Sequence, residues 1–381
     1  MYTCAAQTAY STGRYERIET LVSEIFKNSR ELLHQLKASI ALMESFVARN
    51  QTKRAFDFGL EILQDSKRVS MPSKVSRCRY LWNILKLKKV LRQFTDGQIK
   101  ALQKLHDEEL HHLMRMMNFL SVYALYCRPF YGPYLSIQVV FLTIKNGLCS
   151  FSATAFAMLG VFFCNHFGDI KLGFRLAQLS LDLIEELDDA DARTRILYWT
   201  HCYIFALKEP MENVLTPLLT GHREGLANGD VEVGMLCAAA YTALSINASI
   251  PLSTVIEDGE IFLKLMESYR QTNVVQFMSV NLQFCLNMAS AECDNPVELS
   301  GRYMNEELFR TRQSVNNPLA IAVLDKATIQ VACFFSRLQS RRGDFKEIHK
   351  EGYGRFYSIP SRGRFPLFRD MFCWTRQFQR C

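Results

Sequence analysis

Several common signatures of catalysis are missing from this sequence. It has no CxxC pair, no Walker A motif, no GxSxG and no HRD followed by a DFG. Their absence disfavours thiol redox enzymes, phosphate-loop NTPases, α/β-hydrolases and protein kinases. The 381 residues also include only 10 prolines and 18 glycines, few for an all-β chain, whereas 49% of the residues are hydrophobic. Helices are therefore favoured from the outset.

A secretory leader and a disulfide framework are not evident either. The N-terminal residues show no basic stretch followed by an apolar one, and the 12 cysteines are scattered through apolar segments. This pattern predicts reduced, packed cysteines in a cytoplasmic or nuclear protein, and we expect a cytoplasmic location.

The charge is unevenly placed along the chain. The net charge is +7, and residues 337–381 hold 11 basic and 4 acidic residues, which gives 11 − 4 = +7. The body before this end is therefore balanced overall, which disfavours a general nucleic-acid-binding role. The basic end is also rich in aromatic residues, so docking, a truncated repeat, contact with single-stranded nucleic acid and disorder all remain open for it.

Apolar residues recur at helical spacing along most of the chain. Short breaks with turn residues, such as Gly168-Asp169, Asn228-Gly229 and Asn295-Pro296, separate these segments and indicate antiparallel helix pairs. The predicted helical ranges are 14–49, 52–67, 75–94, 98–118, 134–146, 152–166, 170–187, 192–206, 211–227, 231–246, 256–270, 274–291 and 319–338.

Three of the turns introduce similar helices, each with two small residues one turn apart. Gly168 and Asp169 precede Gly173 and Ala177, Gly229 and Asp230 precede Gly234 and Ala238, and Asn50-Gln51 precedes Ala55 and Gly59. Small residues at this spacing let a neighbouring helix approach closely, as in tetratricopeptide-like arrays.

We therefore predict an all-α fold, an irregular tetratricopeptide-like α-solenoid of stacked antiparallel helix hairpins. The expected organisation is a flexible N-terminus at 1–13, a repeat array at 14–338 and a basic, aromatic-rich segment at 339–381. In such an array, damage to one hairpin is expected to stay near that hairpin.

Two patterns resemble ligand sites without completing them. The glycines at 168 and 173, like those at 229 and 234, have phosphate-loop spacing, but the Lys and Ser or Thr that should follow are absent. The cluster from His106 to His112 lacks the HExxH arrangement and is typical of a solvated charged helix face. The sequence thus predicts no catalytic, cofactor or metal site, and protein partners in place of nucleic acid.

A polytopic membrane protein is the alternative. The uncharged runs at 146–168 and 233–256 are long enough to cross a bilayer. Both contain several Ser, Thr and Asn residues, which are costly in hydrocarbon, so buried repeat helices are favoured and membrane insertion is disfavoured.

One stretch resembles a known group of proteins. The order Lys208-Glu209-Pro210, then Pro217-Leu218-Leu219 with Gly221, then Gly229-Asp230 with Glu232 is similar to the helical-repeat region of large predicted signalling ATPases. Residues 15–72 and 152–187 resemble the start and middle of that region. The resemblance implies a tetratricopeptide-like scaffold that lies between an AAA-like NTPase module, often behind a Ser/Thr kinase, and GAF or histidine-kinase domains. It implies a coupling role in signal transduction for this segment, with the flanking domains or other proteins as partners.

Overall fold

The computed structural model describes residues 2–29, 31–128, 130–187, 189–289, 297–313 and 317–340. Within these ranges the fold is all-α with no β-strand, as the sequence predicted. The basic segment from residue 341 to 381 lies outside the described residues. The helices are α1 (Tyr2–Ser11), α2 (Tyr15–Asn28), α3 (Leu32–Ala48), α4 (Thr52–Asp65), α5 (Arg77–Gln93), α6 (Asp96–Lys100), α7 (Glu108–Cys127), α8 (Tyr131–Asn146), α9 (Ser150–Phe167), α10 (Ile170–Leu187), α11 (Ala190–Tyr203), α12 (Met211–Asn228), α13 (Val231–Ser245), α14 (Leu252–Ser268), α15 (Thr272–Ala289), α16 (Glu306–Leu308) and α17 (Pro318–Ser340).

The N-terminus differs from the expected flexible segment. Residues 2–11 form α1, and its Ala6, Ala9 and Tyr10 are buried against the following helices. The apolar stripe predicted over 14–49 is divided into α2 and α3, because Ser29 is extended and ends α2. A continuous stripe of apolar residues cannot distinguish one long helix from two helices that bury the same face.

The helix predicted for 98–118 is also interrupted. Helix α6 ends at Lys100, and α7 begins only at Glu108. The carboxylate of Asp107 accepts a hydrogen bond from the Leu110 N–H over 2.9 Å, which caps the start of α7. An acidic N-cap of this kind satisfies one of the free N–H groups of the first turn.

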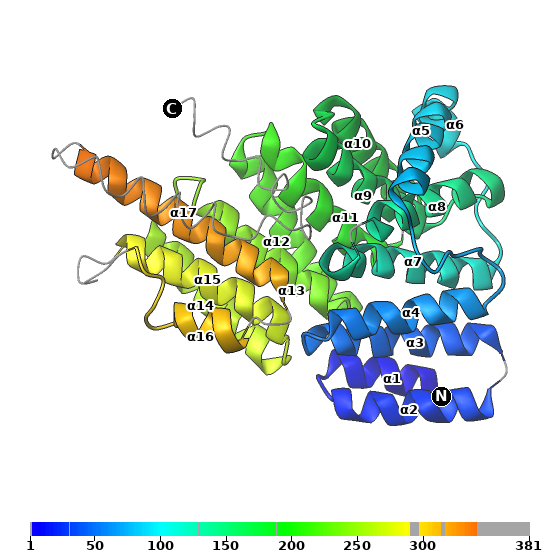
Figure 1. The fold of residues 1–381 in the computed structure, drawn as a ribbon, viewed down its shortest axis with the longest axis horizontal. Helices are drawn as coiled ribbons and strands as arrows, with labels where there is room; N and C mark the ends of the chain where they lie inside the picture. Colours follow the sequence, from blue (N-terminus) through cyan, green and yellow to red (C-terminus); the bar gives the residue numbers. More distant parts are fainter. Residues whose placement is uncertain are drawn as a thin grey trace.

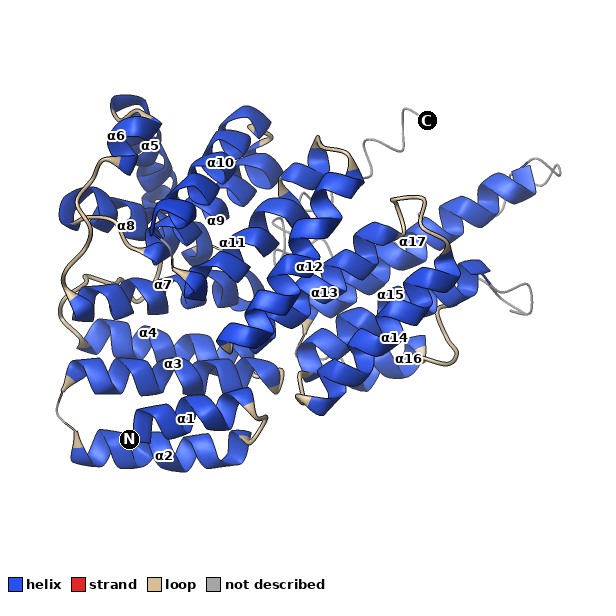
Figure 2. Ribbon diagram, turned by 180° about the vertical axis from the view of Figure 1, so that it is seen from behind, coloured by secondary structure: helices blue, strands red, loops and turns tan. Residues whose placement is uncertain are grey.

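The helices form two alternating sets (Figures 1 and 2). In one set, each helix contacts the next member of the set, and we call this set the row: α1, α3, α7, α9, α11, α13, α15 and α17. The other long helices, except α5, pack between successive row members, as α4 does between α3 and α7 and α12 does between α11 and α13. Helix α5 lies outside this order and packs on α8.

Two members of the row that are distant in the sequence, α3 and α15, are in contact. Helix α15 contacts α3, and the Tyr15 hydroxyl donates a hydrogen bond to the Tyr269 carbonyl over 2.9 Å. The Gln271 side-chain amide donates to the Tyr15 oxygen over 3.1 Å. The turn between α14 and α15 is thereby fixed to the start of α2, and the row curves back on itself.

Helix α9 is the one described helix that is long and apolar enough to cross a membrane. About nine tenths of it is buried, by α8, α10 and α11 among others, and the other uncharged run contains the shorter α13.

Candidate functional site

The three turns selected from the sequence share one backbone geometry. Their first residues all have positive φ: Asn50 at 59°, Gly168 at 65° and Gly229 at 81°. Glycine and asparagine adopt this left-handed conformation most readily, and it ends a helix. The next helix then begins in the same way in each case, with N–H groups donating over 2.9 to 3.0 Å from Ala55 to Gln51, Gly173 to Asp169 and Gly234 to Asp230.

The small residues after these turns lie where helices touch. A Cβ atom on Gly173 would overlap Cys164 Sγ on α9, and one on Gly59 would lie 2.7 Å from Met43 Sδ on α3. At Gly234 it would lie 3.2 Å from the His222 carbonyl oxygen on α12. The second small residues are also buried: Gly59, Ala177 and Ala238. Larger side chains would therefore separate the two helices of each hairpin.

The three turns do not mark equivalent points of a repeat. The α3–α4 and α9–α10 turns lead out of the row, whereas the α12–α13 turn leads into it. A tight hairpin with close helix contact needs the same small residues wherever it occurs, so the sequence pattern reports hairpins and not a repeat period.

Asp230 belongs to a group of four buried charged residues, which we call the charge cluster: Glu44, Arg195, Asp230 and Glu232. Nη2 of Arg195 on α11 lies 2.8 Å from an Asp230 carboxylate oxygen and 3.5 Å from one of Glu44 on α3. These three side chains are at most 10% exposed. The Arg195 guanidinium carbon also lies 4.0 Å from the centroid of the Phe119 ring on α7. Arg195 therefore ties together α3, α7, α11 and the start of α13.

The charge cluster contains more carboxyl groups than guanidinium groups. Burial raises the pKa of Glu44 to about 8, although Arg195 and Arg115 oppose the shift. Burial likewise raises the pKa of Glu232 to about 7. Burial alone would lower the pKa of Arg195, but the carboxylates of Asp230, Glu44 and Glu232 outweigh that effect and raise it. The guanidinium therefore stays charged, while the cluster retains protons near neutral pH.

Two tyrosines complete this interior. Tyr10 on α1 and Tyr123 on α7 are fully buried, and burial raises the pKa of both. Their hydroxyl groups and one oxygen of Glu232 have no hydrogen-bond partner within the described residues. Buried polar groups in this state are costly, so the centre of the row carries polarity that its own helices only partly satisfy.

The charge cluster links helices in the interior of the row. Glu44, Arg195 and Glu232 are buried and the Asp230 side chain is 10% exposed, so little of the cluster is accessible to solvent. No set of three or more His, Cys, Asp or Glu side chains within the described ranges could hold a metal ion.

The cluster from His106 to His112 is divided between the surface and the interior, since His106 is exposed and His112 is buried. Glu108 is exposed and pairs with Lys37 over 2.8 Å, whereas His112 is buried, so the expected solvated face holds only in part. Burial lowers the pKa of His112 and of His201 to about 4, which keeps both rings neutral. Eight of the described cysteines, among them Cys149, Cys164 and Cys237, are free thiols.

Sequence reasoning identified Asp230 as a turn residue and missed its partners. The available signal was a single charge within an apolar stretch, as Glu44 is in Ser39–Ala48. Such a residue predicts a buried partner but does not identify it.

Comparison with known proteins adds no relative: no family model, no curated protein and no solved structure matches this chain.

Proposed function

We propose that this chain is a non-catalytic, tetratricopeptide-like α-solenoid scaffold that binds protein partners and couples the domains of a multidomain signalling ATPase or kinase in the cytoplasm. The alternation of row helices and intervening helices supports the stacked-hairpin arrangement, since each hairpin buries its apolar face on its neighbours. The sequence resemblance supplies the expected flanking NTPase, kinase and GAF domains.

The bridge through Arg195 is the observation that carries the coupling role. It joins residues 151 positions apart in the chain, and the α3–α15 contact joins α3 to a second helix that is distant in the sequence. Neighbour-to-neighbour stacking alone would let a disturbance fade along the array. A row that meets itself transmits a displacement of one hairpin to helices distant in sequence.

Hydrogen exchange on Ala238→Leu tests this. Ala238 is fully buried on α13, so the larger side chain should loosen the α11–α13 contact. If the row is coupled, the amides of α3 lose protection together with those of α13. Protection lost only in α11–α14 is the result expected from the sequence for an open stack, and it would contradict the coupling role.

Ala327→Leu is the matched control. Ala327 is buried on α17 at the far end of the row, where the contact is with α15. Its effect should be largest in α15 and α17 and should reach α3 only through α15, so α3 should lose less protection than in Ala238→Leu. The surroundings of the gene provide a separate check on the parent architecture, which predicts an NTPase coding region before this segment and a GAF or kinase region after it.

A further inference from the structure

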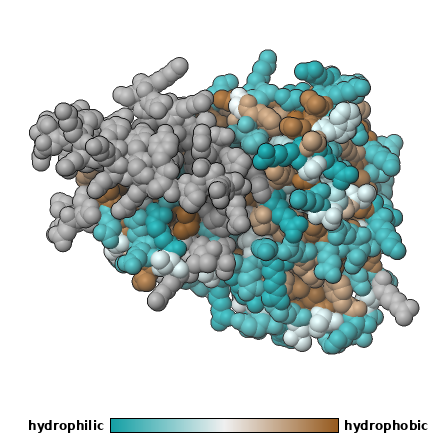
Figure 3. Space-filling model, viewed as in Figure 1, coloured by the Kyte–Doolittle hydropathy of each residue, from teal (hydrophilic) through white to brown (hydrophobic). Residues whose placement is uncertain are grey.

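Helix α5 exposes an unusual amount of apolar surface. The side chains of Leu81, Trp82 and Leu85 are 53%, 68% and 63% exposed, and no other described helix has three large exposed apolar residues. Phe167 and Ile170 in the nearby α9–α10 turn are exposed as well. In Figure 3, apolar patches interrupt the hydrophilic surface over the part of the molecule where α5 and α10 lie.

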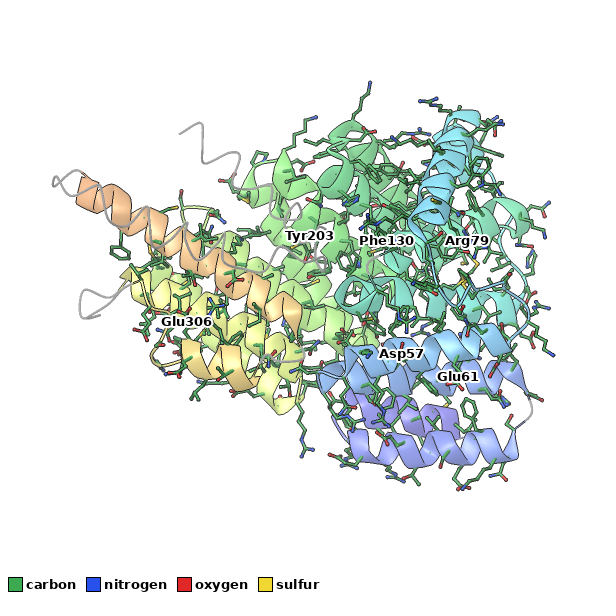
Figure 4. All side chains as sticks on the ribbon, in the orientation of Figure 1. Asp57, Glu61, Arg79, Phe130, Tyr203 and Glu306 are labelled. Atoms are coloured by element: carbon green, nitrogen blue, oxygen red, sulfur yellow. The ribbon has the colours of Figure 1, made fainter. Side chains whose placement is uncertain are left out.

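Helix α5, which carries this apolar face, is firmly attached to the rest of the molecule. The opposite face of α5 is buried through Tyr80, Ile84, Leu87 and Leu91. The Tyr80 ring lies 5.6 Å from the ring of Phe130, which sits between α7 and α8 beside the start of α5 (Figure 4). Arg175 of α10 donates hydrogen bonds to the carbonyls of Leu91 and Phe94 at the other end. The exposed face is therefore held in a fixed position.

Positive charge surrounds the face. Residues 66–95 contain nine basic and no acidic residues, so their net charge of 9 − 0 = +9 exceeds the +7 of the whole chain. Only Arg68 and Lys88 among the nine have a carboxylate within ion-pairing distance in the described residues. Lys86, Lys89 and Arg92 are exposed and lie on the side of α5 that carries Trp82 and Leu85.

The charge restricts what can cover this face. Residues 341–381 hold ten basic and four acidic residues, so this segment would be repelled. A second copy would place the same positive face opposite. The occupant must be anionic, and it must also accept protruding Leu and Trp side chains, which a nucleic acid backbone does not favour. The exposed apolar residues lie along a single helix, an arrangement that can lie flat on a planar partner.

We propose that α5 docks this protein on an anionic phospholipid surface, with Leu81, Trp82 and Leu85 entering the headgroup boundary and the lysines and Arg92 contacting lipid phosphates and carboxylates. An apolar stripe with Trp and Leu flanked by cations is the pattern of helices that lie in the membrane interface. Such a helix does not cross the bilayer, so the proposal needs neither α9 nor α13 in lipid. It is independent of the scaffold function, because an interaction segment can act in solution or at a membrane.

Co-sedimentation of the full chain with phosphatidylcholine vesicles, with and without phosphatidylserine, tests the proposal. We expect binding only with phosphatidylserine and loss of binding at high salt. The triple variant Lys86→Glu, Lys89→Glu, Arg92→Glu should weaken binding about 100-fold or more, since each cation near the surface contributes about fivefold. The exposed Lys264→Glu on α14 is the charge control and should leave binding nearly unchanged.

The apolar part is tested separately. Leu81→Asn with Leu85→Asn should reduce binding, whereas Ile261→Asn, on the distant α14 and 64% exposed, should not. In a Trp374→Phe background, Trp82 emission should shift to the blue on adding anionic vesicles, since Trp199 is already buried. Trp82→Phe should remove that shift.

Three outcomes would overturn the proposal. One is no binding to phosphatidylserine vesicles at low salt. A second is binding unaffected by the triple reversal, which would assign it to the basic segment 341–381. A third is binding of polyglutamate or RNA that depends on α5 while vesicles stay unbound, which would assign the face to an acidic protein or a nucleic acid.

Discussion

Replacing Arg195 by methionine removes the guanidinium that contacts the carboxylates of both Glu44 and Asp230. Methionine keeps an unbranched apolar side chain in the space beside Phe119, so the main loss is the charge. Truncating one partner of a buried ion pair leaves an uncompensated buried charge and costs about 3–5 kcal/mol of unfolding free energy. We expect Arg195→Met to fall in that range.

Arg193→Met is the matched control on the same helix. Arg193 pairs with Glu224 over 3.1 Å, but the two side chains are 43% and 33% exposed. A pair of that exposure contributes about 0–1 kcal/mol. The difference between the two variants therefore isolates burial, since both remove one arginine from α11.

Urea unfolding followed by circular dichroism measures both costs, at pH 8 and at pH 5.5. Losing Arg195 raises the pKa values of Glu44 and Glu232 further, so the carboxylates of the variant gain protons as the pH falls. The cost of Arg195→Met should consequently shrink toward pH 5.5, while that of Arg193→Met should change little. Equal costs for the two variants, or a cost independent of pH, would refute the reasoning.

Other expectations follow from the same contacts. Glu44 and Glu232 keep protons in the folded chain up to about pH 7 to 8, whereas burial keeps His112 and His201 neutral and opposes this effect below the usual histidine pKa of 6.5. Stability should therefore fall from about pH 6.5 to pH 8, and Glu232→Gln should flatten that slope in a thermal melting series. Gly173→Ala should destabilise by more than about 1 kcal/mol because its Cβ meets Cys164 Sγ, whereas Gly97→Ala, with nothing within 4 Å, should be neutral or stabilising by about 0.5–1 kcal/mol; equal melting temperatures would contradict the close contact. Ala238→Leu should cost about 1–3 kcal/mol in urea unfolding, and a neutral result would remove Ala238 from a helix contact. Isothermal titration with ATP should give no saturable signal, since Gly173 and Gly234 lack the following Lys and Ser or Thr; micromolar binding lost in Gly229→Ala would contradict this.

The local features of the fold were accessible from the sequence. Apolar periodicity gave most helices, and the turns at Gly168 and Gly229 were expected because a glycine before a new apolar run supplies the positive φ that ends a helix. The errors have a local cause as well. The break at Ser29 and the cap at Asp107 compete with an apolar stripe that continues across them, and the stripe was followed instead.

The non-local features were not accessible in the same way. Small residues after the turns predicted close helix contacts but not their place in the array, because the α12–α13 hairpin uses the same residues as α9–α10 in the opposite sense. The exposure of one face of α5 could not be predicted from the sequence, since Leu81 and Leu85 are apolar like Tyr80 and Ile84 on the buried side of the same helix. The spacing of apolar residues shows that a helix is apolar on two sides, and only the packing shows which side is covered.

By itself, then, the sequence determined that this chain is helical, where most of its helices turn and which positions must stay small, because these properties depend on contacts within a few residues or one hairpin. Tertiary structure alone decided that Arg195 faces Glu44 across 151 residues and that α3 meets α15. A charged residue in an apolar helix does not indicate which residue it pairs with. The curvature that brings the partners together results from small rotations at many helix contacts.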